Sequence, residues 1–334
     1  MIKNRNIDAG AAIALSKLEG GGGSLIGAGE MFYVCPATSA LYDLWRERVP
    51  KANLSLTVES AYSRAVSGRN DVIVLSPDTH TLSSMLSITK DRVHIMGANI
   101  IDRYYGQRAK VDLTATTGAT NIATIQITGQ GCSLTGLKVR NYSTVAEGLY
   151  ALADGGEYTQ IRACELYKAT DLNEDEAAEL LCNGDGSQYI GCTIGNTVDA
   201  ITATGARPCV KFNRETITGK VARDVMFKDC ILQRKAGATG NFFMYGSGAT
   251  DIERMCLIED CKFFNTKLAG GTPAQTVGFG AALTVGYVLL VNPYSVGSAT
   301  ALSTTTGVFA IGPDCGADAT TEGSAQMGIA IQCN

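Results

Sequence analysis

The chain has 334 residues, of which 28 are Lys or Arg and 32 are Asp or Glu, so its formal net charge is −4. Charges of both signs are mixed along the sequence without a basic block, which excludes the electrostatic footprint of a nucleic-acid-binding protein. No apolar run reaches the roughly 18 residues of a membrane-spanning helix, and the N-terminal residues lack the apolar core of a secretory signal. The many Gly, Thr and Val residues favour an all-β protein of short strands and tight turns.

Residues 1–19 are predicted to form a helix, because Ile7, Leu15 and Leu18 recur at helical spacing. The glycine run from Gly20 to Gly23 ends this helix and acts as a flexible joint. An isolated helix of this length is marginal in water and orders only against a partner surface. We therefore expect Ile7, Leu15 and Leu18 to be buried on another protein or on a sister subunit, as an attachment arm.

Residues 30–35 are predicted to form a first strand, and residues 42–49 a short helix. Thr57 can cap a further helix, because apolar residues at helical spacing follow it. An open stack of strands needs a cover over its exposed edge. We expect the helix that begins after Thr57 to be the lid over the first coil.

A six-residue cassette recurs six times after the lid. The copies are Ile95–Ile100, Leu134–Val139, Ile161–Leu166, Tyr189–Ile194, Phe227–Leu232 and Ile258–Phe263, and their starts are 39, 27, 28, 38 and 31 residues apart. A period in this range with strand-like patterning is typical of a solenoid in which each repeat is one coil. The third position is Gly, Ala or Asp, residues that suit a sharp bend. The fourth and sixth positions share one face of a strand, so they should stack as ladders inside a parallel β-helix.

Two inward ladders are expected from this register. The first is predicted to contain Ala98, Leu137, Cys164, Cys192, Cys230 and Cys261, and the second Val139, Leu166, Ile194, Leu232 and Phe263. Nearly all parallel crossovers are right-handed. The predicted fold is therefore an all-β, right-handed, single-stranded parallel β-helix.

The eleven cysteines are interpreted through this register. The absence of a Cys-x-x-Cys motif and the presence of only two histidines, His80 and His94, argue against a zinc site. Four of the thiols share one cassette position, where they act as small apolar side chains. A disulfide framework is the alternative, although the odd number of cysteines argues against complete pairing. A reducing cytoplasm is the simpler inference for the compartment of folding.

The acidic segment from Asn173 to Leu181 is predicted to be a short helix outside the coils, since acidic residues at its start suit the helix dipole. A calcium site is the alternative, but the ligand and glycine arrangement of a calcium loop is missing. Residues 266–334 become rich in Gly, Ala, Thr and Ser. We interpret the chain as an N-terminal arm and joint (1–29), a first strand and lid helix (30–70), a β-helix (71–265) and a C-terminal β cap that is a possible association domain (266–334).

The sequence offers no convincing catalytic site. Local carboxylate pairs occur at Asp154 and Glu157, at Asp171 and Glu174, and at Glu259 and Asp260, but alternation along a strand does not aim the last pair into one groove. Arg162, Arg214, Arg223 and Lys228 are spread over several coils without an obvious acidic partner set. We therefore predict no catalytic, cofactor-binding or metal-binding residues, with a polysaccharide hydrolase or lyase as the minority interpretation.

The first coil resembles the opening of right-handed β-helix proteins of the pectate-lyase-like group. The resemblance rests on Asn70-Asp-Val-Ile-Val-Leu-Ser-Pro77 and on Val93-His-Ile-Met-Gly97. It implies the β-helix fold and says little about function, because one fold hosts many activities.

Two further stretches resemble virion proteins of tailed bacteriophages. They are Asn6 to Leu18, with the core Ala-Ala-Ile-Ala-Leu-Ser-Lys-Leu, and Gly286 to Gly297, which reads Gly-Tyr-Val-Leu-Leu-Val-Asn-Pro-Tyr-Ser-Val-Gly. The order of arm, first strand, lid, coils and tail is similar to β-helix proteins encoded among phage head genes. The cysteine ladder departs from that pattern and leaves a role for thiols in particle stability open.

This resemblance implies a non-enzymatic structural protein that decorates the capsid on the virion surface and is assembled in the cytoplasm of a bacterial host. The implied partners are the major capsid protein or other virion proteins, without nucleic acid or membrane, and a homo-oligomer is expected, most plausibly a trimer. The alternative is a receptor-binding tail fibre or spike that binds and degrades a glycan. A free bacterial carbohydrate-active enzyme is a third interpretation, and a groove lined by aromatic and acidic residues on adjacent coils would favour either of these two.

Overall fold

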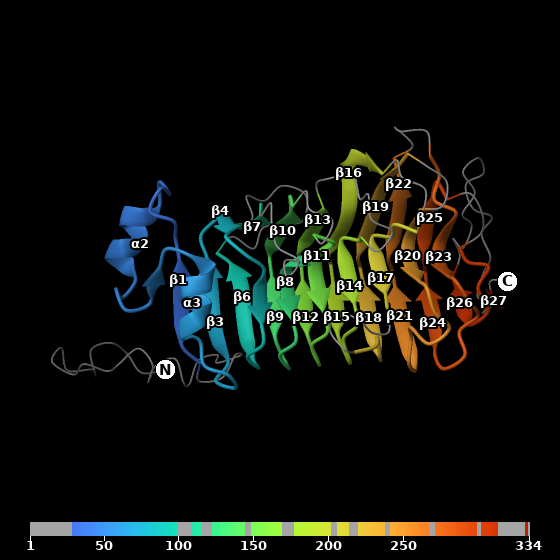
Figure 1. Cartoon of the computed structure of the whole chain (residues 1–334), viewed down its shortest axis with the longest axis horizontal. Coiled ribbons are helices and arrows are strands. Elements are labelled where there is room, and N and C mark those ends of the chain that lie inside the picture. Colours follow the sequence, from blue (N-terminus) through green and yellow to red (C-terminus); the bar gives the residue numbers. More distant parts are fainter. Residues whose placement is uncertain are drawn as a thin grey trace, which may run out of the picture.

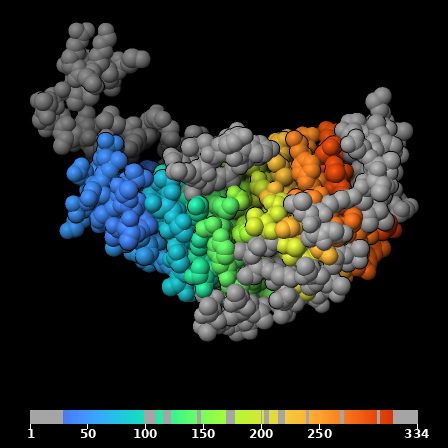
Figure 2. All heavy atoms as spheres, turned by 90° about the horizontal axis from the view of Figure 1, so that it is seen from above, coloured from blue at the N-terminus to red at the C-terminus, as the bar shows by residue number. Residues whose placement is uncertain are grey.

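The computed structural model describes residues 29–98, 109–114, 122–143, 148–168, 177–201, 206–213, 220–237, 241–266, 271–298, 302–312 and 331–332. These residues form a right-handed parallel β-helix, as the cassettes predict (Figure 1). Each full coil gives one strand to each of three sheets, here called sheets A, B and C in the order in which the chain visits them. The space-filling view shows the coils as successive bands of colour along the long axis (Figure 2).

Sheet A is the longest and extends beyond the other two sheets at the N-terminal end. Its strands lie in the order β2 (Leu54–Ser55), β1 (Met31–Val34), β3 (Asp71–Leu75), β6 (Val93–Gly97), β9 (Ser133–Thr135), β12 (Gln160–Arg162), β15 (Gln188–Ile190), β18 (Val225–Lys228), β21 (Met255–Glu259), β24 (Tyr287–Val291), β26 (Val308–Ile311) and β27 (Ile331–Gln332). All neighbours in it are parallel except β26 and β27.

Sheets B and C complete the three-sided coil. Sheet B contains β4 (Thr79–Leu82), β7 (Ala109–Leu113), β10 (Leu137–Asn141), β13 (Glu165–Lys168), β16 (Thr193–Ile201), β19 (Ile231–Ala236), β22 (Lys262–Asn265) and β25 (Tyr294–Val296). Sheet C contains β5 (Leu86–Ile88), β8 (Ala123–Ile127), β11 (Tyr150–Asp154), β14 (Leu180–Cys182), β17 (Val210–Phe212), β20 (Phe242–Gly246) and β23 (Gln275–Phe279).

The corner between sheets A and B is a single left-handed residue. The third cassette position adopts it in five consecutive coils, at Gly136, Ala163, Gly191, Asp229 and Asp260, with φ between 50° and 66°. Gly, Asn and Asp tolerate this conformation best, and a single such residue turns the strand sharply into the next sheet. The small or acidic residues of the cassette therefore mark this corner.

The residue after the corner begins the first inward ladder. Strand pairing places Leu137, Cys164, Cys192, Cys230 and Cys261 in register, and all five are fully buried. Ala98 does not belong to this ladder, because it is exposed and Ala109 pairs with Leu137 instead. Residues 99–108, which include Ile100 of the first cassette, lie outside the described residues, and the next strand of sheet B is β7.

The second ladder has the predicted composition, with Val111 as its first member. Val139, Leu166, Ile194, Leu232 and Phe263 are in register and are fully buried. Together the two ladders fill the inside of sheet B with small and large apolar side chains in alternation. Such a column packs one coil on the next at the density of a protein interior.

The thiols of the first ladder make weak hydrogen bonds as well as apolar contacts. Cys192 Sγ donates to the carbonyl of Ile161 at 3.3 Å, and Cys230 Sγ donates to that of Tyr189 at 3.3 Å. Each thiol therefore reaches the strand of sheet A that belongs to the preceding coil. Among the described residues all nine cysteines are free and buried: Cys35, Cys132, Cys164, Cys182, Cys192, Cys209, Cys230, Cys256 and Cys261. A disulfide framework among these nine is not present.

Two helices precede the coils, as the sequence predicts. Helix α2 spans Tyr42–Arg48, and helix α3 spans Val58–Arg64. Thr57 caps α3 by accepting the backbone N–H of Ser60 at 3.2 Å, and Val58 and Ala61 are buried. Their side chains belong to the same core cluster as the first coils, so α3 covers the N-terminal end of the core.

Two segments differ from the sequence-based expectation. Leu180 and Leu181, expected at the end of a short helix, lie in strand β14, because their side chains pack in sheet C; residues 173–176 lie outside the described residues. The coils were expected to end at residue 265, but β23, β24, β25 and β26 continue the three sheets. The Gly-rich composition of this region makes the alternation of apolar and polar residues in those strands hard to recognise in the sequence.

A polar column runs inside the corner between sheets B and C. Strand register places Asn141, Lys168, Asn196, Arg234 and Asn265 on successive coils, all of them buried. Asn196 Nδ2 donates to the carbonyl of Lys168 at 2.8 Å, and the other two asparagines also donate to backbone carbonyls. Arg234 makes two bonds to the buried Glu179, of 3.0 and 2.9 Å. These side chains satisfy backbone groups where the chain leaves sheet B.

We predict that the protein loses stability steeply in mild alkali. Burial raises the pKa of Cys132 to about 11 and that of Cys209 to about 12, and the pKa values of Cys182 and Cys230 rise as well. Unfolded thiols lose their protons near pH 8.5 while the buried ones keep them, so the stabilisation is complete below that pH and falls above it. Each such thiol contributes a slope of about 1.4 kcal/mol per pH unit.

The measurement is the urea midpoint between pH 8 and pH 10.5, where we expect it to fall continuously. Burial lowers the pKa of Lys168 to about 8, which acts in the opposite direction, but it is one group against several thiols. The variant Cys209→Ala should have a slope that is shallower by about 1.4 kcal/mol per pH unit. A midpoint that stays constant over this range would contradict the prediction.

Candidate functional site

A second column of left-handed residues runs along the outer corner between sheets C and A. Its members on consecutive coils are Arg92, Gly131, Tyr158, Gly186, Asp224 and Arg254, with φ between 47° and 92°. Glycine accepts this conformation without cost, whereas a bulky residue in it is an outlier. Tyr158 is the one aromatic residue of this column, and it stands between two glycines.

Tyr158 lies open to solvent in this strained position. Its φ is 55° and 61% of the residue is exposed. A Cβ added to Gly186 would come within 2.7 Å of the Tyr158 ring, so the ring lies directly over that glycine. Strained backbone is retained where the surroundings require it, and such residues cluster at functional sites. The glycine, which has no side chain, thus leaves space for an exposed aromatic ring to lie against the backbone of the next coil.

On each of these coils the residue that precedes the left-handed residue in the sequence is charged or polar, and these residues form a second column beside the first. Its members are Asp91, Gln130, Glu157, Asp185, Arg223 and Glu253, and parallel bridges join Glu157 to Asp185 and Asp185 to Arg223. We call these six residues, together with Tyr158, Lys220, Asp224 and Arg254, the corner strip. Because parallel strands lie about 4.8 Å apart, successive members of the column are close neighbours.

Ion pairs connect the corner strip across four coils. Glu157 accepts bonds from Lys220 Nζ at 2.8 Å and from Gln130 Nε2 at 3.4 Å. Arg223 bonds Asp185 at 3.1 Å on one side and Glu253 at 2.7 Å on the other, and the bond to Glu253 raises the pKa of Arg223. These side chains remain partly exposed, so their mutual attraction is weak and a charged or hydroxyl-rich ligand can compete for them.

Arg254 brings a second guanidinium group to Asp185. Its NH2 lies 3.6 Å from Asp185 and also pairs with Asp224. Asp185 therefore lies between two arginines, while Glu157 on the adjacent coil faces a single lysine. Glu157 and Asp185 thus stand on adjacent rungs, whose backbones lie about 4.8 Å apart in a parallel sheet.

Two of the carboxylate pairs named from the sequence lie among the described residues, and the fold does not bring either pair together in one groove. Asp154 lies inside the coil and is fully buried, whereas Glu157 lies on the corner strip. Burial raises the pKa of Asp154, although Tyr189 donates its hydroxyl to this carboxylate at 2.6 Å. Glu259 pairs with Lys228 at 2.9 Å, and Asp260 is the left-handed corner residue. Asp171, Glu174 and Arg214 lie outside the described residues.

The basic residues behave differently from the sequence-based expectation. Arg223 and Lys228, expected to lack an acidic partner set, both form ion pairs with carboxylates on neighbouring coils. His80 is buried and bonds the carbonyl of Ser76 at 2.9 Å, and burial lowers its pKa. His94 lies 2.8 Å from the hydroxyl of Ser133. Both histidines therefore have structural positions.

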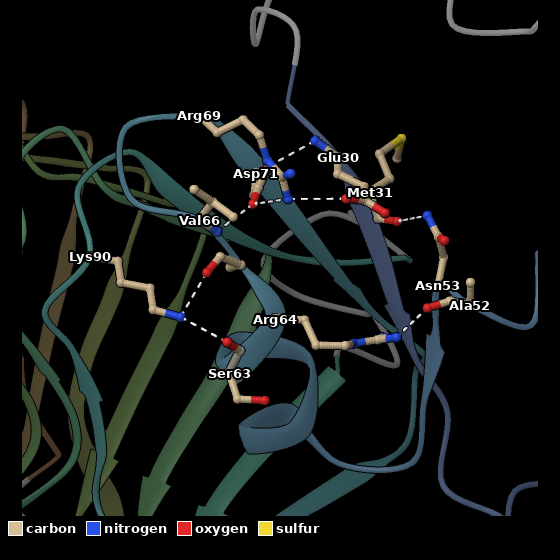
Figure 3. Close-up of polar contacts among 11 residues, drawn as sticks. Glu30, Met31, Ala52, Asn53, Ser63, Arg64, Val66, Arg69, Asp71 and Lys90 are labelled. Carbon is tan, nitrogen blue, oxygen red and sulfur yellow. Dashed lines mark hydrogen bonds and ion pairs between the residues drawn. The ribbon is translucent and has the colours of Figure 1, made fainter.

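The N-terminal end holds the point at which the arm leaves the body (Figure 3). Asp71, completely buried, accepts two bonds from Arg69, at 2.6 and 2.8 Å, and one from the backbone N–H of Glu30 at 2.8 Å. It also accepts the N–H of Val66 at 2.7 Å, and Arg69 reaches Glu30 Oε2 at 3.0 Å. Burial by itself would raise the pKa of Asp71, but these bonds outweigh it and lower the pKa.

We call the bonds that join Asp71 to Arg69, Val66 and Glu30 the clamp. Two cations hold the lid helix α3 in place beside the clamp (Figure 3). Lys90 Nζ donates to the carbonyls of Tyr62, Ser63 and Ala65, at 2.7 to 3.0 Å, and so neutralises the C-terminal end of α3. Arg64 bonds the Ala52 carbonyl and lies over the ring of Phe32, 4.9 Å from its centroid. The predicted arm residues Ile7, Leu15 and Leu18 lie outside the described residues. What the structure fixes is the exit point of the arm at Glu30.

No group of three His, Cys, Asp or Glu side chains among the described residues is arranged to hold a metal ion. No helix in this part of the chain is long and apolar enough to cross a membrane.

Comparison with known proteins identifies the fold alone. No protein family matches the chain, and no curated protein matches it. Pectin methylesterase from Aspergillus niger is similar in structure, with a TM-score of 0.56 and 13% identity over 91% of each chain. Pectate lyase Pel9A has a TM-score of 0.55 and 12% identity over 81% of this chain and 64% of the lyase. A Geobacillus virus E2 protein has a TM-score of 0.40, which is too low to support an argument.

These comparisons overturn the expectation that the chain is not an enzyme. The similar structures are enzymes, including the pectin methylesterase PemA from Erwinia chrysanthemi with a TM-score of 0.51 over 91% of this chain. The expectation had rested on carboxylate pairs that are close in sequence and on the lack of an acidic partner set for the basic residues. Such reasoning does not consider residues from different coils, such as Glu157 and Asp185, which are 28 residues apart and are brought onto adjacent coils only by the fold.

We predict that the clamp contributes strongly to the stability of the N-terminal end. The variant Asp71→Asn removes the charge that Arg69 and two backbone N–H groups bind, and should cost about 2 kcal/mol, less than a fully buried ion pair because Arg69 is partly exposed. The measurement is urea unfolding at pH 7. The control is Asp43→Asn, which removes an exposed pair with Arg46 and should change stability by less than about 0.5 kcal/mol. Equal effects of the two substitutions would refute this role of Asp71.

Proposed function

We propose that the protein is a carbohydrate-active β-helix of a tailed-phage particle, which binds a polysaccharide along the corner strip and cleaves it there. The observation that carries the proposal is Tyr158, a strained and exposed aromatic ring seated on Gly186 among carboxylates and guanidinium groups. Aromatic faces and charged hydrogen-bonding groups together are what a sugar ring requires, since one side of the ring is apolar and its rim carries hydroxyls. The run of charged residues over consecutive coils suits an extended chain of sugars.

The proposed chemistry uses the two carboxylates on adjacent rungs. Glu157 protonates the leaving oxygen of the glycosidic bond, and Asp185, oriented by Arg223 and Arg254, attacks the anomeric carbon. Water then releases the sugar, and Glu157 takes up a proton from that water. The fold supports a polysaccharide as substrate because the similar structures are pectin methylesterases, one of them in complex with a hexasaccharide, and a pectate lyase.

We predict that Tyr158→Gly abolishes polysaccharide binding while the fold is kept. Glycine accepts the left-handed backbone, so stability should stay constant or rise by about 1 kcal/mol. Loss of the ring should weaken binding at least about tenfold, which corresponds to 1.4 kcal/mol. The measurement is affinity electrophoresis against polygalacturonate and a panel of purified bacterial capsular polysaccharides.

The matched control is Tyr294→Ala, which removes another exposed tyrosine, on sheet B and not at the corner between sheets C and A. It should bind as the unmodified protein does. Glu157→Gln should retain binding and lose the release of reducing ends. If the Tyr158→Gly variant binds each polysaccharide that the unmodified protein binds, and does so as tightly as the control variant, the corner strip is not the glycan site.

Attachment to the particle is the second part of the proposal. The arm of residues 1–29, with Ile7, Leu15 and Leu18, anchors the protein on the major capsid protein or another virion protein, and the body is displayed on the virion surface as a homo-oligomer, with a trimer expected from the phage resemblance. The clamp supports this role, because it fixes Glu30 on the body, so that the arm and its glycine joint are attached to the β-helix at a defined point.

We predict that deletion of residues 1–19 abolishes binding to particles that lack the protein. The coils should fold unchanged, because the deleted residues precede the clamp and the lid. The measurement is co-sedimentation with stripped particles, with the triple variant Ile7→Ser, Leu15→Ser and Leu18→Ser as a full-length companion. Undiminished sedimentation of the truncated protein would move the attachment site to the coils or to the C-terminal segment.

A further inference from the structure

The N-terminal end of the β-helix carries an apolar surface that the corner strip does not include. Met31, Leu44 and Leu56 are exposed by 40, 40 and 49%. Tyr33 connects Met31 with Trp45, since the rings of Tyr33 and Trp45 meet edge to face at 5.8 Å and the Tyr33 hydroxyl lies 3.8 Å from Met31 Sδ. Leu44 adjoins Trp45 in the sequence, and Leu56 directly follows β2, the strand that pairs with β1 at Tyr33. We call these five residues the N-terminal patch. Large apolar residues that adjoin one another on a surface mark a site of interaction.

Helix α2 contributes two residues of this patch, Leu44 and Trp45. It has seven residues, none of which is buried, and it stands at the extreme N-terminal end of the molecule (Figure 1). A helix of this length is unstable unless an apolar face is packed against something. The contact of Trp45 with Tyr33 covers part of one side, and Leu44 stays open. A further apolar partner would complete the packing of α2.

The chain itself supplies a segment that can reach the patch. Residues 1–28 precede the first described residue, and the clamp holds their exit at Glu30, next to Met31 in the sequence. The sequence predicts a helix with Ile7, Leu15 and Leu18 on one face, and a helix over residues 7–18 is about 18 Å long. The connecting residues 19–28 can span up to about 33 Å. The arm therefore begins at the patch and is long enough to fold back onto it.

We propose that residues 7–18 dock on the N-terminal patch of the same chain in the free protein, with Leu15 and Leu18 packed against Leu44 and Trp45. Docking gives both short helices the apolar partner that each lacks by itself. It also shields the arm until the particle offers a competing surface. The proposal goes beyond the function proposed above and holds whatever the arm binds on a particle.

Trp45 is the single tryptophan of the chain, so its fluorescence reports on the patch directly. The test compares the full-length protein with the double variant Leu15→Glu and Leu18→Glu. The docked arm should protect Trp45, so the variant should show red-shifted emission and at least a twofold increase in quenching by acrylamide. The matched control is Lys17→Glu, which changes the opposite face of the same helix and should leave both readings unchanged.

Each outcome decides the proposal. Protection of Trp45 that is lost in the double variant and does not depend on protein concentration supports docking within one chain. Protection that appears only as concentration rises, together with dimers in sedimentation, would overturn it in favour of a second copy as the occupant. Identical emission and quenching in the unmodified protein, the double variant and the control would overturn docking altogether. Both substitutions precede the clamp, and unchanged urea unfolding of the coils checks that the variants are folded.

Discussion

At five consecutive corners between sheets A and B the backbone turns through one left-handed residue, and the stacking of the coils on either side depends on that turn. Gly136, Ala163, Gly191, Asp229 and Asp260 all adopt it, so the strands on either side keep the same register from coil to coil. In-register stacking repeats one environment on every rung. The residue after these corners is fully buried, and in two coils its thiol donates to a carbonyl of the preceding coil, Cys192 to Ile161 and Cys230 to Tyr189. A small apolar side chain with a weak donor suits that position, and cysteine has both properties.

The second left-handed column shows what the same backbone does when it faces outward. At this corner the side chain points to solvent, so size is not limited and the residues vary from glycine to arginine. Tyr158 accepts the strain of a left-handed backbone without any gain from burial, and its neighbour in the column, Gly186, leaves room for its ring. The backbone strain at Tyr158 is not offset by packing of its side chain, and this is the physical reason for regarding this corner as a candidate functional site.

The sequence predicts the fold well because the features that define a coil recur at the same cassette positions. The lid cap at Thr57 and the two inward ladders could be read from local patterns, while Ala98 was misplaced because nothing local shows that Ala109 takes its expected place in sheet B. The corner strip was missed because its members share no residue type. A signal did exist, since Gln130, Glu157, Asp185 and Arg223 each stand four residues before the first residue of a cassette. Aligning the cassettes and comparing the positions outside them would have placed these four side chains on one line.

The buried polar groups extend the same argument to the interior. A charge inside a protein is costly unless it is paired and hydrogen-bonded, and Glu179 with Arg234 meets both conditions. Their corner, between sheets B and C, is where several loops leave the coil, so backbone carbonyls there lack a strand partner and the asparagines at 141, 196 and 265 bind them. The three corners thus turn the chain from one sheet to the next in three ways. The corner between sheets A and B uses a left-handed bend followed by thiols. The corner between sheets C and A uses an outward left-handed column with charges, and the corner between sheets B and C uses an inward polar column. The outward corner between sheets C and A carries ion pairs that connect consecutive coils, and their side chains stay partly exposed, so a ligand that approaches this corner meets charged groups directly.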